Sequence, residues 1–176
     1  MALRRLVRNF DEFGDGLFAS LRGRRVPDAV FWAASEGADY SRAWHAINLA
    51  LLATGRHRGD QTVRLAVALG VESAIVNGGL KNLFPRERPP LNDDATFEVR
   101  RPRTKSFPSG HSSSACLTAV LLSDTVAVLR PVWWSLAAIV AVSRVHNRMH
   151  HPSDVVAGAV IGTAMGVAVR RRWPVP

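Results

Sequence analysis

Three short segments of the chain concentrate side chains that can bind and transfer a phosphate group. They are KNLFPRERP at 81–89, PSGH at 108–111 and SRVHNRMHHPSD at 143–154. Lys81 supplies a compact positive charge, whereas Arg88 and Arg144 offer planar sets of donors that match two phosphate oxygens at once. Because three such cations offset much of the charge of a phosphomonoester, the segments predict a phosphate site.

The second segment has the features of a helix start that faces an anion. Ser109 follows Pro108 and precedes a helix-like run, so its side chain can cap that helix. The free N–H groups at the helix start then point toward the phosphate, and Gly110 lets the backbone approach closely. His111 stands at the same end, where it can give a proton to the departing oxygen.

The third segment pairs a histidine with an acid four residues later. Pro152 is favourable in the first turn of a helix, so Asp154 can reach back to His150 and fix its tautomer. The other ring nitrogen can then attack phosphorus, which predicts a phosphohistidine intermediate that water hydrolyses. Since side chains supply the positive charge that the transition state needs, we expect no metal and no cofactor.

Each segment alone has an ordinary interpretation as a helix-end charge, a helix cap or a surface hydrogen bond. Together and in this order, they resemble the type 2 phosphatidic acid phosphatase family. Its pattern is a lysine, six residues and Arg-Pro; then Pro-Ser-Gly-His; then Ser-Arg, five residues, His, three residues and Asp. Residues 81–89, 108–111 and 143–154 fit this pattern without a departure.

The resemblance implies a helical bundle with its active site at one end, and a role for each matched residue. By similarity the phosphate-binding residues are Lys81, Arg88, Ser109, Gly110 and Arg144, and the catalytic residues are His111 as general acid, His150 as nucleophile and Asp154 as its orienting partner. His146 and His151 match no position in the pattern and are interpreted as loop histidines; a substrate contact or a proton relay is the alternative. His45 and His57 lie outside the matched region and are interpreted as structural.

Apolar segments of helical character make up much of the chain. They cover residues 65–80, 115–129, 132–142 and 155–169, and the last carries Gly158, Gly162 and Gly166 at a spacing that lets helices pack closely. Residues 29–54 are interrupted by charges and form either one tilted span or two half-depth helices. We therefore predict an all-α transmembrane bundle of about five to six helices with the active site at one membrane face. A soluble helical bundle is the alternative.

The N-terminal region has a different character. Aromatic residues and leucines recur every three to four positions among arginines and acids, which predicts an amphipathic helix. It lies either on the membrane surface or packed on the rest of the protein. Asp11, Glu12 and Asp15 interrupt the apolar core of a cleaved signal peptide, so we expect the segment to be retained. The predicted division is an amphipathic segment at 1–27 and a type 2 phosphatidic acid phosphatase-like membrane domain at 28–176.

The net charge of +9 arises from short basic clusters between nearly uncharged stretches. This distribution is typical of a membrane protein, so we expect membrane lipids and no nucleic acid as partners. If Arg170–Arg172 are cytoplasmic, the loops that carry the motifs lie on the opposite side. The composition is typical of a bacterium, and the prediction is a multi-pass inner-membrane protein with an extracytoplasmic active site. The single cysteine, Cys116, excludes an internal disulfide.

These observations predict a metal-independent lipid phosphatase. Its substrate would be phosphatidic acid, phosphatidylglycerophosphate, or a polyprenyl phosphate or diphosphate, which share a phosphate at the membrane surface. One alternative is a catalytically silent protein that binds or transports a lipid phosphate. The other is a vanadium haloperoxidase, a family that resembles this one in the same site but whose members are generally larger and soluble.

Overall fold

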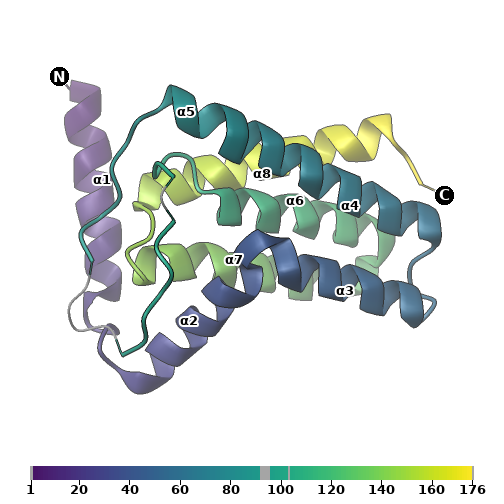
Figure 1. Cartoon of the computed structure of the whole chain (residues 1–176), viewed down its shortest axis with the longest axis horizontal. Coiled ribbons are helices and arrows are strands. Elements are labelled where there is room, and N and C mark those ends of the chain that lie inside the picture. Colours follow the sequence, from purple (N-terminus) through teal and green to yellow (C-terminus); the bar gives the residue numbers. More distant parts are fainter. Residues whose placement is uncertain (1, 92–95, 103, 176) are drawn as a thin grey trace.

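The regular elements are helices, and no strand occurs in the part of the chain that the structure describes. The computed structural model describes residues 2–91, 96–102 and 104–175. Its helices are α1 (Ala2–Ala19), α2 (Arg25–Ala38), α3 (Arg42–Ala53), α4 (Gly59–Ser73), α5 (Lys81–Leu83), α6 (Gly110–Thr125), α7 (Arg130–His146) and α8 (Pro152–Arg172), with 3₁₀ turns η1 (Asp39–Ser41) and η3 (Ala127–Leu129) (Figure 1). The π-helical turn η2 (Ala74–Leu80) joins α4 to α5, so that Gly59–Leu83 is one continuous helix.

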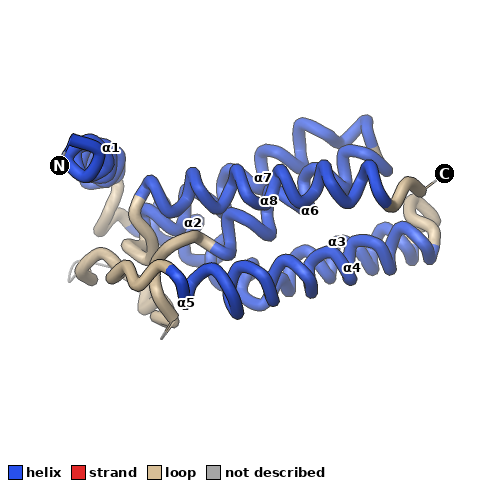
Figure 2. Tube along the Cα trace, turned by 90° about the horizontal axis from the view of Figure 1, so that it is seen from above, coloured by secondary structure: helices blue, strands red, loops and turns tan. Residues whose placement is uncertain are grey.

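The central helix of the bundle is α6. Its apolar and small residues occur all round the helix, a pattern typical of a helix buried on every side. Every residue from Ser112 to Ser123 is buried. α6 packs against α8, α7 and α4, and the view in Figure 2 shows α6, α7 and α8 on one side of the bundle with α3 and α4 on the other.

α8 approaches α6 so closely that glycine is required along the contact. A β-carbon at Gly158 would lie 2.3 Å from the Ser109 carbonyl oxygen, and one at Gly162 would lie 1.9 Å from that of Ser113. Gly166 continues the same face. The four-residue glycine spacing is therefore the contact face between these two helices, as predicted.

Among the residues that the structure describes, three helices are long and apolar enough to cross a membrane: Gly59–Leu83, Ala127–His146 and Pro152–Arg172. Within the first of them, Arg64 and Glu72 are each 1% exposed, so these ionisable side chains point into the bundle as a lipid environment requires. The prediction of an all-α transmembrane bundle is confirmed.

α2 and α3 are two helices that meet at a sharp bend. At this bend, in η1, Tyr40 and Ser41 have φ angles of 54° and 58°. This left-handed conformation costs about 1–3 kcal/mol for each residue other than glycine, and it persists only where the surrounding structure holds it. Of the two arrangements predicted for residues 29–54, the structure has the pair of helices.

The connections that carry the motifs lie at one end of the bundle. The α5–α6 connection and the α7–α8 connection share the end near α1, whereas the C-terminus and the α3–α4 turn lie at the other end (Figure 1). We call the first the motif end. α1 lies across the motif end, transverse to the other helices.

α1 contacts the bundle through a narrow face. Asp11 on this face is buried, and a β-carbon at Gly14 would lie 2.7 Å from Cγ of Pro152 on α8. Phe18 also takes part, because its ring packs edge-on against Phe31 and His146. Another set of large apolar side chains stays 46% to 72% exposed, namely Leu3, Leu6, Phe10, Phe13 and Leu17. α1 is therefore packed on the protein while its apolar face stays uncovered.

The glycine contact gives a stability prediction. Gly162→Ala should cost about 1–3 kcal/mol, because its β-carbon meets the α6 backbone, and should lower Tm by about 5 °C in detergent. Gly70→Ala, within the continuous helix Gly59–Leu83, is the control, because a β-carbon there meets nothing within 4 Å. Equal Tm values for the two variants would contradict the assigned contact.

Candidate functional site

A cavity of about 880 Å³ opens at the motif end. Six of the eight predicted site residues line it: Lys81, Arg88, Gly110, His111, Arg144 and His150. The other two, Ser109 and Asp154, lie behind this wall and are 0% exposed. The structure thus brings together three motifs that are far apart in the sequence.

Two of the cationic side chains in the cavity wall are almost fully buried. Lys81, in α5, is 6% exposed, and Arg144, in the last turn of α7, is 1% exposed. The Arg144 guanidinium donates to Oγ of Ser35, but its Nε has no hydrogen-bond partner. Because a buried donor without an acceptor costs about 1–3 kcal/mol, a bound anion would stabilise this arrangement.

Arg88 is held by the loops on either side of it. Its Nη1 donates to the Met149 carbonyl at 2.6 Å, and its Nε donates to the Thr104 carbonyl at 3.1 Å. Nη1 also lies 3.2 Å from Nε2 of His150. Burial, and then the charge of Arg101, lower the pKa of Arg88 to about 10, so the side chain is a cation at neutral pH.

Ser109 begins α6 as a capping residue. Its Oγ accepts hydrogen bonds from the Ser112 amide at 3.4 Å and the Ser112 hydroxyl at 2.9 Å. Its amide donates to the Asp154 carbonyl at 3.0 Å, which ties the start of α6 to α8. A β-carbon at Gly110 would lie 2.7 Å from Oδ1 of Asn77, so the next position has no room for a side chain.

His150 and Asp154 face each other across the first turn of α8. Nδ1 of His150 lies 3.8 Å from Oδ2 of Asp154, and catalytic pairs are often this loose before substrate binds. Burial lowers the pKa of His150 well below its ordinary value; the nearby Asp154 opposes this, and the charges of Arg144 and Arg88 reinforce it. The ring is therefore neutral at pH 7. Because Arg88 donates to Nε2, we assign the ring proton to Nδ1.

The Asp154 carboxylate is fixed by donors that sequence reasoning missed. Oδ2 accepts from the Ser106 hydroxyl at 2.5 Å and the His151 amide at 2.9 Å, and Oδ1 accepts from Nη1 of Arg86 at 2.6 Å. The available signal was the additional arginine two positions before Arg88, which lies inside the first motif but at no matched position.

Asp39 is another cavity residue that sequence reasoning missed. It lies in η1, with its Oδ1 2.8 Å from Nε2 of His111. Burial alone would raise the pKa of Asp39, but the His111 contact and the charge of Arg144 lower it below its ordinary value. The available signal was a charged residue inside an apolar segment, which in membrane proteins points to function.

Some histidines match no position of the motif pattern, and the structure places them in different parts of the bundle. His146 is buried against Asp28, with Nε2 and Oδ1 2.8 Å apart, and His57 and His151 also lie outside the cavity wall. His45, which the sequence led us to interpret as structural, lines the cavity.

The cavity offers positive donors and imidazoles. Within residues 2–91, 96–102 and 104–175, no three His, Cys, Asp or Glu side chains are grouped so as to hold a metal ion. Nε of Arg144 and Nδ1 of His150 are buried without hydrogen-bond partners. Cationic side chains with unused donors suit an anion with several oxygens, such as phosphate.

Comparison with known sequences gives a family and curated relatives. Residues 61–174 match the model of the PAP2 superfamily. The chain is 34% identical over 142 residues to the decaprenylphosphoryl-5-phosphoribose phosphatase of Mycolicibacterium smegmatis, a match that covers 80% of this chain and 76% of the relative. It is 31% identical to the protein of the same name from Mycobacterium tuberculosis, over 69% of this chain and 66% of the relative.

Two solved structures share the fold. The transmembrane PAP2-type phosphatidylglycerolphosphate phosphatase of Bacillus subtilis superposes with a TM-score of 0.73 at 21% identity, over 95% of this chain and 86% of the other. LpxE of Aquifex aeolicus superposes with a TM-score of 0.70 at 25% identity, over 89% and 93%. Because the family match covers more than half of a chain that also carries the three motifs, the chain belongs to the PAP2 superfamily and is a phosphatase of that kind.

Proposed function

We propose that the chain hydrolyses a phosphate ester of a membrane lipid through a phosphohistidine at His150, without a metal ion. The observation that carries this proposal is a single cavity in which a neutral, buried histidine backed by a carboxylate faces three cationic side chains. The cations would bind the phosphate and stabilise the charge of the transition state, so that the histidine can act as a nucleophile.

The first step transfers the phosphoryl group to the enzyme. The phosphate would lie among Lys81, Arg88 and Arg144, and Arg88 would turn its Nη1 from His150 to a phosphate oxygen. The freed Nε2 lone pair forms a bond to phosphorus as the bond to the lipid oxygen breaks. Asp154 stabilises the positive charge that His150 then carries.

The leaving oxygen and the attacking water both need a proton carrier, and we assign this role to His111. Protonated His111 gives its proton to the leaving oxygen, so the lipid departs as a neutral alcohol. Neutral His111 then takes a proton from the water that attacks the phosphohistidine, and the P–N bond breaks to regenerate His150. Burial and the charge of Arg144 lower the pKa of His111 to about 4, and Asp39, 2.8 Å from its ring, opposes this effect. The negative charge of the bound phosphate would raise the pKa further, so that His111 takes up its proton before the first step.

Among lipid phosphates, we propose a polyprenyl-linked substrate with a phosphorylated sugar as the first candidate. The names of the mycobacterial relatives describe such a substrate. The cavity wall also carries polar side chains that suit sugar hydroxyls, namely Tyr40, His45, Asn77 and Arg100. A cavity of about 880 Å³ can hold more than a phosphate group. Phosphatidic acid, phosphatidylglycerophosphate and simple polyprenyl phosphates are the competing substrates.

We propose a bacterial inner-membrane location with the cavity on the extracytoplasmic face. In support, Arg170–Arg172 and the α3–α4 turn with Arg56 and Arg58 lie at the end opposite the cavity (Figure 1). The arginines of α1 lie at the cavity end and count against this orientation. We assign them to contacts with lipid headgroups, because the apolar face of α1 is uncovered and suits the bilayer surface.

Phosphate release from a lipid panel tests the reaction. The panel contains a polyprenyl phosphoribose phosphate, polyprenyl phosphate and diphosphate, phosphatidic acid and phosphatidylglycerophosphate. Release should persist with chelator, and His150→Ala should lower it by about 10³-fold or more. Equal release by both proteins would place the nucleophile elsewhere. No release from any lipid would favour a silent binding protein.

Removing the Asp39 carboxylate tests the proton donor. Asp39→Asn should lower kcat by roughly tenfold, because protonated His111 loses its counter-charge. Asp28→Asn is the matched control, since Asp28 forms a similar 2.8 Å pair with His146 outside the cavity. The same decrease in both variants would indicate a general loss of structure instead of a role for Asp39.

Cysteine labelling tests the orientation and the position of α1. In a Cys116→Ser background, a membrane-impermeant maleimide applied to spheroplasts should label Glu12→Cys on the polar face of α1. Arg172→Cys should react only after permeabilisation, and Phe13→Cys should stay protected in lipid throughout. Labelling of Arg172→Cys without permeabilisation would reverse the orientation. Labelling of Phe13→Cys as readily as Glu12→Cys would remove α1 from the bilayer.

A further inference from the structure

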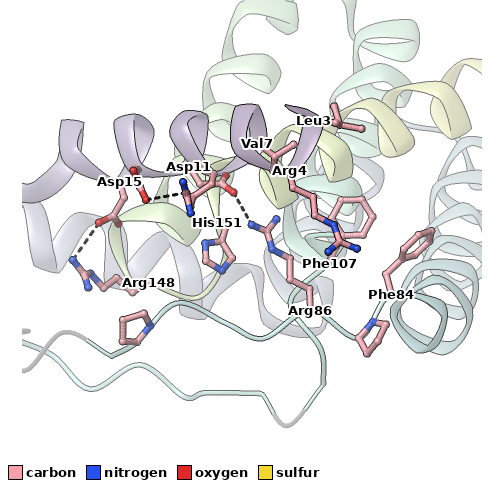
Figure 3. A pocket seen from close by; sticks show the side chains of 14 residues that line it. Leu3, Arg4, Val7, Asp11, Asp15, Phe84, Arg86, Phe107, Arg148 and His151 are labelled. Carbon is pink, nitrogen blue, oxygen red and sulfur yellow. Dashed lines mark hydrogen bonds and ion pairs between the residues drawn. The ribbon is translucent and has the colours of Figure 1, made fainter. Parts of the chain in front are cut away.

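α1 places one charged group directly behind the site. Within Ala2–Ala19, Asp11 is the one buried residue. A carboxylate is seldom buried without partners, because losing its hydration is costly. Its Oδ2 accepts from Nη2 of Arg86 at 2.6 Å (Figure 3). Its Oδ1 accepts from the amide of Ser153 at 2.8 Å.

Arg86 connects Asp11 to the catalytic pair. Figure 3 shows Arg86 extending from its loop toward Asp11 on α1. One nitrogen of its fork donates to Asp11, and the other donates to Oδ1 of Asp154 at 2.6 Å. This second nitrogen also donates to the Ser153 hydroxyl at 2.7 Å. Because the guanidinium is planar and rigid, a carboxylate on each nitrogen fixes the position of both acids.

We propose that Asp11 and Arg86 are positioning residues for the Asp154–His150 pair, an inference that rests on the proposed function. Neither residue lines the 880 Å³ cavity, so neither would touch the substrate. They would act by holding Asp154 where it can face Nδ1 of His150. The N-terminal helix then completes the back of the catalytic site.

Asp11 also supports the Asp154–His150 pair through its negative charge. Two carboxylates and one guanidinium leave a net negative charge beside His150, which becomes positive when it is phosphorylated. Without Asp11, Asp154 alone would neutralise Arg86 and would be drawn toward it. The 3.8 Å gap between Asp154 and His150 leaves little margin for such a shift. The effect should therefore fall on the chemical step and not on substrate binding.

Asp15 provides a matched control on the same helix. It accepts from Arg148 at 3.2 Å and also pairs with Arg22. Arg22 in turn donates to the His146 carbonyl at the end of α7, so Asp15 also fastens α1 to the bundle. The arginine that contacts Asp154 is Arg86, whereas the partners of Asp15 are Arg148 and Arg22. Asp15→Asn thus weakens the docking of α1 and leaves the Arg86 connection in place.

Steady-state kinetics of the full-length protein in detergent separate the two roles. With the panel lipid that wild type turns over fastest, Asp11→Asn should lower kcat by about tenfold and leave KM within about twofold. Asp15→Asn should leave both constants within about twofold. Equal losses in the two variants, or a change in KM alone, would overturn the positioning role. Should Asp11→Asn fail to fold, Arg86→Lys makes the same test, because lysine keeps the charge but cannot span both carboxylates.

A measurement that needs no turnover keeps this inference separate from the proposed function. ¹⁵N-histidine NMR reports which ring nitrogen of His150 carries the proton. The Nδ1–H tautomer should dominate in wild type and Asp15→Asn, and both tautomers should appear in Asp11→Asn. An unchanged spectrum in Asp11→Asn would refute the positioning role even if the enzyme is active. Wild type that hydrolyses no panel lipid would refute the proposed function, and the spectra would still decide the role of Asp11.

Discussion

The motif end of the molecule depends on keeping the Asp154 carboxylate charged while it is fully buried. A charge inside a protein is tolerated only when hydrogen bonds replace its hydration. Here the donors are Ser106, His151 and Arg86, which come from the connection before α6, the N-cap of α8 and the first motif. The loops of this end are thus joined through the Asp154 side chain. Their positions are fixed by the hydrogen bonds that this carboxylate requires.

In the cavity, the charge that needs compensation is positive. Lys81 and Arg144 are buried close to Arg88, and cations that share a confined space repel one another. Asp39 lines the same cavity and offsets part of this charge. The charge of an anionic ligand would offset the remainder. Substrate binding then removes repulsion as well as forming contacts.

Much of this architecture can be predicted from the sequence because it depends on local patterns. The motif spacing indicates which cations and histidines meet, and the glycines of α8 indicate a close helix contact. The contacts Asp39–His111 and Asp11–Arg86 could not be predicted, because each joins segments whose proximity appears only once the helices have packed. The bend in η1 was equally hidden, since no glycine marks its left-handed residues.

The close glycine contact between α6 and α8 separates two groups of residues around the cavity, those on the paired helices and those on the segments around them. The starts of α6 and α8 are joined at this contact, because the Ser109 amide donates to the Asp154 carbonyl and Ser109 lies against Gly158. Tyr40 and Arg100, by contrast, reach the cavity from a bend and a connection outside that contact. During divergence, these two side chains can therefore be replaced while Asp39 and Arg88, which lie in the same segments, are kept. Substitutions at such positions would let relatives with the same three motifs acquire different headgroup preferences.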